Sequence, residues 1–207
     1  REANYGREDP RLFVHNGALH VAFIGVVGGG RRVSHSNQMY ARLTDDLQLD
    51  DVFAPAYRDR QPWEKNWQFF SSGGSLYAVY SVNPYVVLRV DGHLTEVAFR
   101  HPAAFPWQGG EVRGGAAPVL VGGEWWSFFH DRIDAVTGKR VYRAGLYTFA
   151  ADPPFAPLRY IPSPILTADL RQKPPDQYAH VIWPGGAVRR ENAWTLECGI
   201  HDRWTEL

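Results

Sequence analysis

The sequence lacks what several simple functional classes require. It has one cysteine, Cys198, in 207 residues, which excludes an internal disulfide and a multi-cysteine zinc site. Its 22 basic residues balance 22 acidic ones, which argues against binding nucleic acid or a membrane surface through a basic excess. No apolar run is long enough to cross a bilayer. We expect no nucleic-acid or membrane partner, and the lone cysteine, an expected core residue, favours a reducing compartment, the cytoplasm.

Helical periodicity is also almost absent. The best helix candidate begins at Thr167, but the segment 168–172 is short and lies beside Pro174 and Pro175. Short apolar runs instead alternate with glycine, proline, asparagine and aspartate, the pattern of many short strands joined by turns. The scattered histidines show no zinc-protease spacing. The sequence therefore predicts an all-β protein with no metal site.

A pair of predicted strands recurs four times, at a spacing of roughly fifty to sixty residues. Asn16–Gly17, between the first two strands, is a strong hairpin signal. The pairs are 11–14 with 18–25, 67–70 with 75–81, 117–121 with 124–130, and 179–183 with 193–199, the last turning at 184–186. Third and fourth strands are predicted at 38–43 and 51–53, at 85–90 and 95–99, and at 142–149 and 157–161. Such a repeat predicts the blades of a β-propeller, a single domain over residues 1–207.

The ends of the chain do not complete a ring. A propeller closes its ring to hide the edges of its blades. The last repeat stops after its second strand, and no blade precedes Gly6. We therefore expect part of the first blade to be missing, and the sequence to be a fragment or a domain of a longer protein.

Polar residues collect where the predicted strands begin and end. In a propeller these points crowd around the central axis. The stretch Glu8-Asp9-Pro10-Arg11 opens the first strand, and Pro10 is expected to push Asp9 towards an extended conformation. Taken alone, each residue has an ordinary explanation: a surface ion pair for Lys65 or Asp131, a buried core position for His130. Their recurrence in successive repeats instead favours a binding centre for a polyol.

An ordered set of motifs carries a resemblance to a known family. The set is 8–11, then 64–66, then 114–118 leading to Phe129 and His130, then 142–146, and finally 199–202. It resembles the five-bladed β-propellers of glycoside hydrolase family 130, which are β-mannoside phosphorylases and β-mannosidases with related mannosyltransferases. The resemblance covers nearly the whole chain from Gly6.

The resemblance implies a reaction and a set of site residues. Phosphate would attack the anomeric carbon of a β-mannoside in one inverting displacement while Asp9 protonates the departing oxygen, in the phosphorylases by relay through the 3-hydroxyl of the sugar. Arg11 would orient Asp9 and favour its charged form. Lys65 and His130 would hold phosphate, a possible co-substrate, and no cofactor is implied. The substrate-binding residues would be Glu8, Arg11, Asn66, Tyr80, Arg113, Asp131, Tyr142 and Asp202.

The chain departs from the phosphorylases at the end of the second repeat's second strand. They carry an arginine where this sequence has residues 80–83, Tyr-Ser-Val-Asn, and phosphate without that arginine would be poorly neutralised unless Arg113 compensates. Two hypotheses stay open. One is an enzyme, a phosphorylase, hydrolase or glycosyltransferase, acting on an oligosaccharide or sugar phosphate. The other is a non-catalytic glycan-binding or scaffolding propeller module of a larger glycan-processing protein.

Overall fold

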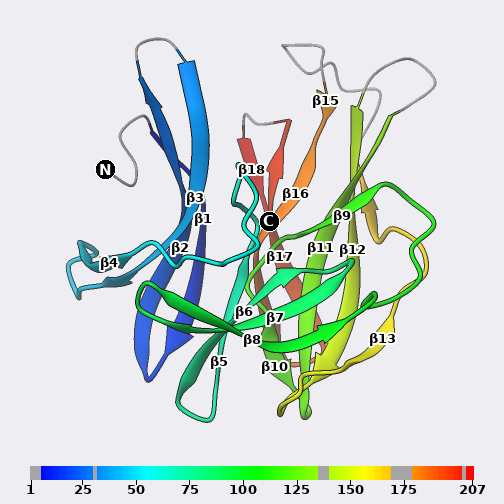
Figure 1. Ribbon diagram of the computed structural model, residues 1–207. Helices are drawn as coiled ribbons and strands as arrows, with labels where there is room; N and C mark the ends of the chain where they lie inside the picture. The colour runs from blue at the N-terminus through cyan, green and yellow to red at the C-terminus, as the bar shows by residue number, and fades with distance from the viewer. Residues whose placement is uncertain (1–5, 30–31, 135–139, 169–178, 202–203) are drawn as a thin grey trace.

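The computed structural model describes residues 6–29, 32–134, 140–168, 179–201 and 204–207 (Figure 1). These residues form eighteen strands and no helix, so the all-β prediction is confirmed for this part of the chain. With no helix present, these residues also contain no helical segment that could span a membrane.

The strands form four sheets in which neighbours in sequence are mostly neighbours in space. All pairs are antiparallel except β12 with β15. The first sheet contains β1 (Gly6–His15), β2 (Ala18–Gly29), β3 (Arg32–Leu43) and β4 (Leu49–Phe53), and the second contains β5 (Gln68–Ser72), β6 (Ser75–Ser81), β7 (Tyr85–Asp91) and β8 (Leu94–His101). The third contains β9 (Glu111–Gly114), β10 (Val119–Val121), β11 (Glu124–Asp134), β12 (Arg140–Ala150), β13 (Pro157–Tyr160), β14 (Leu166–Thr167) and β15 (Ala179–His180). The fourth contains β16 (Ile182–Arg190), β17 (Ala193–Ile200) and β18 (Trp204–Glu206).

Two-residue turns build the first three hairpins where the sequence predicts them. Asn16 and Gly17 have φ of 49° and 75°, and both residues of Gly73–Gly74 and of Gly122–Gly123 also have positive φ. Positive φ at both turn residues matches the right-handed twist of the flanking strands, and glycine and asparagine adopt it at little cost. These dipeptides therefore fix the register of the hairpins.

The fourth hairpin differs from the prediction. Pro184 and Gly186 do not form its turn but lie inside β16, where the pairing with β17 is irregular. A bulge tolerates proline because proline has no amide hydrogen to donate to the ladder. The strand continues to Arg190, and the turn occupies Glu191, whose φ is 49°, and Asn192.

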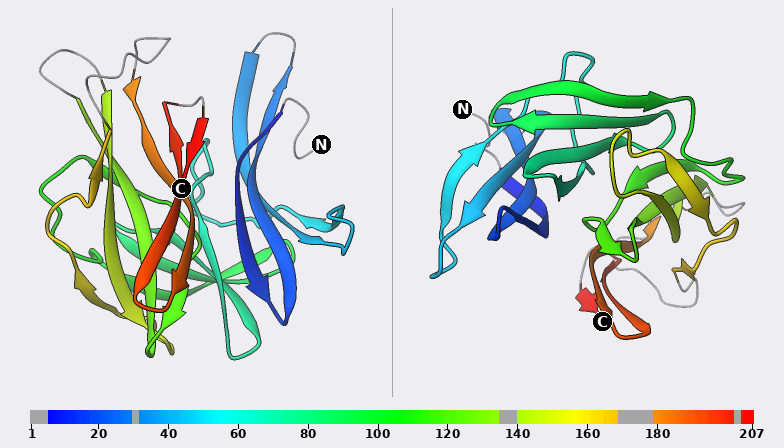
Figure 2. Two further views of the ribbon diagram at one scale, coloured as in Figure 1. Left: turned by 180° about the vertical axis from the view of Figure 1, so that it is seen from behind. Right: turned by 90° about the horizontal axis from the view of Figure 1, so that it is seen from below.

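The four sheets follow one another around a common centre (Figure 2). Strands of different sheets meet at that centre. Strand β1 of the first sheet contacts β5 of the second and β16 of the fourth, and β16 also contacts β10 and β11 of the third. This arrangement of meandering sheets matches the predicted blades. The described residues form four sheets, and the ring of five blades stays a prediction.

Aromatic side chains fill the spaces between the sheets. Phe69 and Phe70 are adjacent on β5 and point to opposite faces of its sheet, as strand geometry requires. Phe69 stacks on Phe13 of the first sheet at 5.3 Å between ring centroids, while Phe70 packs on Phe149 of the third. Most of the aromatic content thus belongs to the core. Cys198 is also buried, which confirms that it is a core residue.

Candidate functional site

A bulge at the start of β1 sets the direction of its two carboxylates. Glu8 pairs with Ile24 and Arg11 with Ala22, so Asp9 and Pro10 together lie opposite one residue of β2. Asp9 has φ of 51°, and the predicted extended conformation is therefore wrong. Aspartate is among the few residues that tolerate this left-handed region. In a regular strand Glu8 and Asp9 would point to opposite faces, but the bulge lets both line one cavity.

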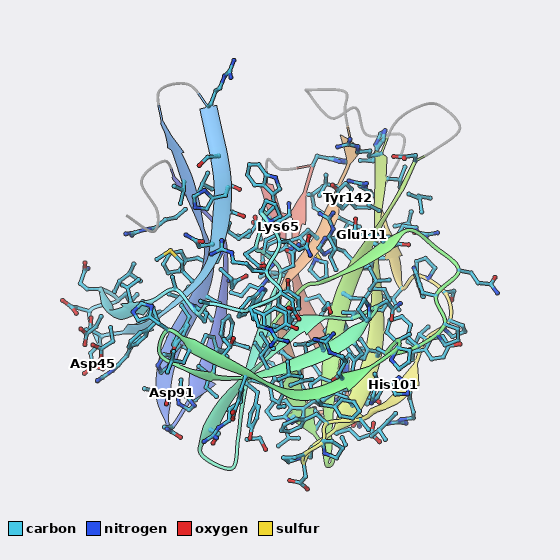
Figure 3. All side chains as sticks on the ribbon, viewed as in Figure 1. Asp45, Lys65, Asp91, His101, Glu111 and Tyr142 are labelled. Atoms are coloured by element: carbon cyan, nitrogen blue, oxygen red, sulfur yellow. The ribbon has the colours of Figure 1, made fainter. Side chains whose placement is uncertain are left out.

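That central cavity has a volume of about 460 Å³ and is formed by residues of the first, third and fourth sheets and of the loop that precedes β5. Most of the site residues named from the sequence meet in it. Figure 3 shows two of them, Lys65 and Tyr142, on the same side of the molecule. The lining residues are Glu8, Asp9, Lys65, Asn66, Arg113, His130, Tyr142, Val181, Trp183 and Gly199.

Arg11 lies beneath the cavity and does not line it. Its side chain is 2% exposed, its Nη2 donates to Asn66 Oδ1 at 2.8 Å, and its guanidinium lies 4.7 Å from the ring centre of Trp183. Within the described part of the chain it forms no ion pair with Asp9, and its Nε and Nη1 have no hydrogen-bond partner. Burial lowers the pKa of Arg11 to about 10, although Asp9 and Glu197 raise it. Arg11 therefore remains a cation that adds positive potential below the cavity.

Two cations and one histidine line the same cavity as the two carboxylates. Arg113 on β9 and His130 on β11 are paired neighbours in the third sheet. Partial burial, and then the charge of Arg113, lower the pKa of Lys65. Burial, and then the charges of Arg11, Arg113 and Lys65, lower the pKa of His130 to about 3. His130 is therefore a neutral imidazole, stacked on Tyr142 with ring centroids 5.9 Å apart.

Because His130 is buried, we predict that the free energy of unfolding depends on pH. Its pKa falls from 6.5 in the unfolded chain to about 3 in the folded protein. Between these values only the unfolded state binds the proton, so the free energy of unfolding is highest above pH 6.5 and falls as the pH drops. We expect this loss to be about 2 kcal/mol at pH 5.

Urea unfolding of the wild type and of His130→Gln, at pH 7.5 and pH 5, measures this effect. The variant is expected to lose less stability between the two pH values. His101→Gln, at an exposed position on β8, is the control and should behave like the wild type. Equal pH dependence in His130→Gln and the wild type would contradict the assignment.

Three other residues were named from the sequence, and the two that the structure describes do not line the central cavity. Tyr80 lines an adjoining hollow and donates its hydroxyl to Glu64 Oε1 at 3.1 Å. Asp131 is buried, and its carboxylate accepts hydrogen bonds from Trp107 Nε1 at 2.8 Å, the Gly110 amide at 3.1 Å and Arg143 Nε at 2.9 Å. Asp202 lies outside the described residues. His130 and Asp131 are neighbours on one strand, so they point to opposite faces.

The sequence reasoning missed Trp183 and Glu197. Trp183 lines the cavity, and its ring packs against the guanidinium of Arg11 in a cation–π contact. Glu197 lines a neighbouring hollow, and burial raises its pKa. Both lie in the fourth sheet. The sequence predicted the hairpin turn of that sheet at residues 184–186, so it did not give the pairing of these two residues. Within the described ranges, no group of three or more histidine, cysteine or acidic side chains could hold a metal ion.

No protein-family model matches the chain, and no curated protein matches its sequence. Solved structures do match its fold. The β-1,2-mannobiose phosphorylase of Listeria innocua, solved with β-1,2-mannobiose, is similar at 18% identity and a TM-score of 0.73 over 99% of this chain and 57% of its own length. A structure described for the GH130 family of mannoside phosphorylases is similar at 14% identity and a TM-score of 0.69 over 97% of this chain and 64% of its own.

A GDP-Man-dependent mannosyltransferase from Leishmania mexicana is also similar, at 17% identity and a TM-score of 0.64 over 97% of this chain. The chain spans 66% of that protein's length, so it is shorter than all three of these proteins. At such identities the likeness concerns the fold and not the activity. The chain therefore shares the fold of these mannoside-processing proteins.

Proposed function

We propose that the protein is a carbohydrate-active enzyme of the GH130 type that cleaves β-linked mannosides, with Asp9 as the proton donor. One observation carries the proposal: Glu8 and Asp9 line one cavity of about 460 Å³ together with Lys65, Arg113 and His130. A carboxylic acid in this cavity can protonate a departing oxygen. Cations in the same cavity suit an anionic nucleophile or a sugar phosphate.

The reaction is a single displacement at the anomeric carbon. A phosphate oxygen bonds to that carbon as the glycosidic carbon–oxygen bond breaks, and the departing oxygen takes the proton of Asp9. The attacking phosphate gives up a proton, which restores the acid form of Asp9. The products are a sugar 1-phosphate of inverted configuration and a shortened glycan.

The nucleophile we favour is inorganic phosphate. The sequence alone did not identify the nucleophile, because residues 80–83 lack the arginine that the phosphorylases carry there. Arg113 lines the cavity beside Lys65 and His130 and provides a second positive charge there, although it also pairs with Glu111 at 2.7 Å. A guanidinium binds phosphate through two parallel hydrogen bonds, which a lysine cannot make. The neutral His130 adds one donor without adding charge.

Proton and phosphorus NMR of β-1,2-mannobiose incubated with the protein, with and without phosphate, tests the proposal. The expected result is α-mannose 1-phosphate plus mannose, formed only when phosphate is present. Release of mannose alone would support cleavage of the glycosidic bond but would contradict phosphate as the nucleophile. Binding of mannobiose without turnover, across β-mannosides of different linkage, would contradict an enzyme and favour the glycan-binding module.

A further inference from the structure

Glu197 on β17 is a carboxylate that the proposed reaction does not use. It lines a hollow of about 910 Å³ together with Glu8 and Asp9, and the lining residues of this hollow come from β1 and from the fourth sheet. The side chain of Thr205 on β18 hydrogen bonds to the Glu197 carboxylate. Within the described residues, the wall of the central cavity does not include Glu197. Glu197 therefore lies near the proposed proton donor without lining the cavity that would hold the substrate.

A bulge in β16 lets this carboxylate pack closely against the strand. The pairing of β16 with β17 skips Gly185. A Cβ atom at Gly185 would lie only 2.5 Å from Glu197 Oε2 and 2.6 Å from Trp183 Cζ3. Glycine, which has no Cβ, leaves room there for both groups. The backbone of β16 thus holds the Glu197 carboxylate and the Trp183 ring close together.

The buried cation of Arg11 connects Glu197 to Asp9. The guanidinium lies 4.7 Å from the ring centre of Trp183. Burial lowers the pKa of Arg11, and the charges of Asp9 and then Glu197 raise it. Burial raises the pKa of Glu197, and the hydrogen bond from Thr205 and the charge of Arg11 lower it. In the part of the chain that the structure describes, Arg11 forms no direct ion pair, so the two carboxylates share one cation at a distance.

The charges around Asp9 otherwise favour its ionised form. The titratable groups that line the central cavity with Asp9 are Glu8, Lys65, Arg113, His130 and Tyr142. Two of these five are cations and one is a carboxylate, while the neutral imidazole and the phenol add no charge. Arg11 adds a third positive charge below the cavity. Nearby cations favour the charged form of a carboxylic acid, whereas a general acid must carry its proton when the reaction begins.

We propose that Glu197 is a positioning residue that acts through Arg11: it balances the guanidinium, so that Asp9 is not the only counter-ion of Arg11 and can keep the proton that cleavage requires. The inference rests on the proposed function, because it assigns Asp9 the same role. It adds a residue outside the central cavity that sets the pH range in which this acid works.

The pH dependence of β-1,2-mannobiose turnover in the wild type and in Glu197→Gln tests the inference. Loss of the charge is expected to lower the pH above which kcat falls by about one unit, the effect of one charge several ångströms away in a partly buried site. Above that pH, kcat should be about tenfold lower than in the wild type. KM should change less than about twofold. At low pH the two proteins should converge, because Glu197 is then protonated in the wild type too.

Two variants and a second substrate make the test specific. Glu197→Asp keeps the charge and should restore most of the loss. Glu191→Gln removes a carboxylate from the exposed turn of the same sheet, and as the control it should match the wild type. With 4-nitrophenyl β-mannoside, whose leaving group needs little protonation, Glu197→Gln should match the wild type at every pH. An unchanged pH profile in Glu197→Gln, or an equal loss with both substrates, would overturn the inference and leave the proposed function intact.

Urea unfolding measures the charge balance without activity. The change in the urea midpoint caused by Glu197→Gln should be less favourable to the folded state in the wild type than in Arg11→Met, because only the wild type loses an attraction to Arg11. Equal changes in the two backgrounds would also overturn the inference. If the wild type turns over neither substrate, the proposed function fails, and the role of Glu197 in the reaction fails with it even where the unfolding data show the balance.

Discussion

Replacement of Asp9 by asparagine is expected to lower the turnover of β-1,2-mannobiose about a thousandfold, in the range that a positioned general acid contributes. Asparagine keeps the size of the side chain but cannot donate a proton to the departing oxygen. Binding should change less than about threefold, since the cavity keeps its shape. Steady-state kinetics of the variant, with calorimetric titration of the same sugar, measures both quantities.

The leaving group provides an internal check of this role. The loss in Asp9→Asn should be much smaller for 4-nitrophenyl β-mannoside, because its phenolate leaves with little protonation. Asp45→Asn is the control, because Asp45 is exposed and lies far from Lys65 (Figure 3). Unchanged turnover in Asp9→Asn, or an equal loss with both substrates, would contradict Asp9 as the proton donor.

Replacement of Asp131 by alanine is expected to lower the free energy of unfolding by about 3–5 kcal/mol. Asp131 is buried, and its removal leaves Arg143, Trp107 and the Gly110 amide without their acceptor. An uncompensated charge and two unpaired donors are then left at a partly buried site. Urea unfolding monitored by tryptophan fluorescence measures the change.

Two variants make this prediction specific. Asp131→Asn keeps an acceptor of the same shape and should lose less stability than Asp131→Ala. Glu96→Ala removes the exposed pair with Arg89, in which the atoms are 3.2 Å apart, and should cost less than about 1 kcal/mol. If Asp131→Ala were no more damaging than Glu96→Ala, the buried cluster would not hold the loop before β9 to the sheet.

The fold was predictable where local chemistry decides the structure. Asn16–Gly17, Gly73–Gly74 and Gly122–Gly123 require positive φ, and each forms the expected hairpin turn. The prediction failed at residues 184–186, where a proline and two glycines resemble a turn but form a bulge within β16. Pairing along the whole of β17 fixes that strand, and no short window of sequence contains this information.

Part of the site could be predicted from the sequence, because the beginnings and ends of the strands meet at the centre of a propeller. This reasoning brought together Asp9, Lys65, Arg113 and His130, which line one cavity. It could not assign Asp131, because the face to which a strand residue points depends on a register that pairing with β9 and β12 sets.

A crystal structure of Asp9→Asn soaked with β-1,2-mannobiose tests the central claim most directly. The account predicts a sugar in the central cavity, with the glycosidic oxygen, or the sugar hydroxyl that relays the proton to it, about 3 Å from the side chain at position 9. Phosphate added to the soak should lie against Lys65, Arg113 and His130. A sugar bound outside this cavity, or bound in it with both of those oxygens far from residue 9, would contradict the account.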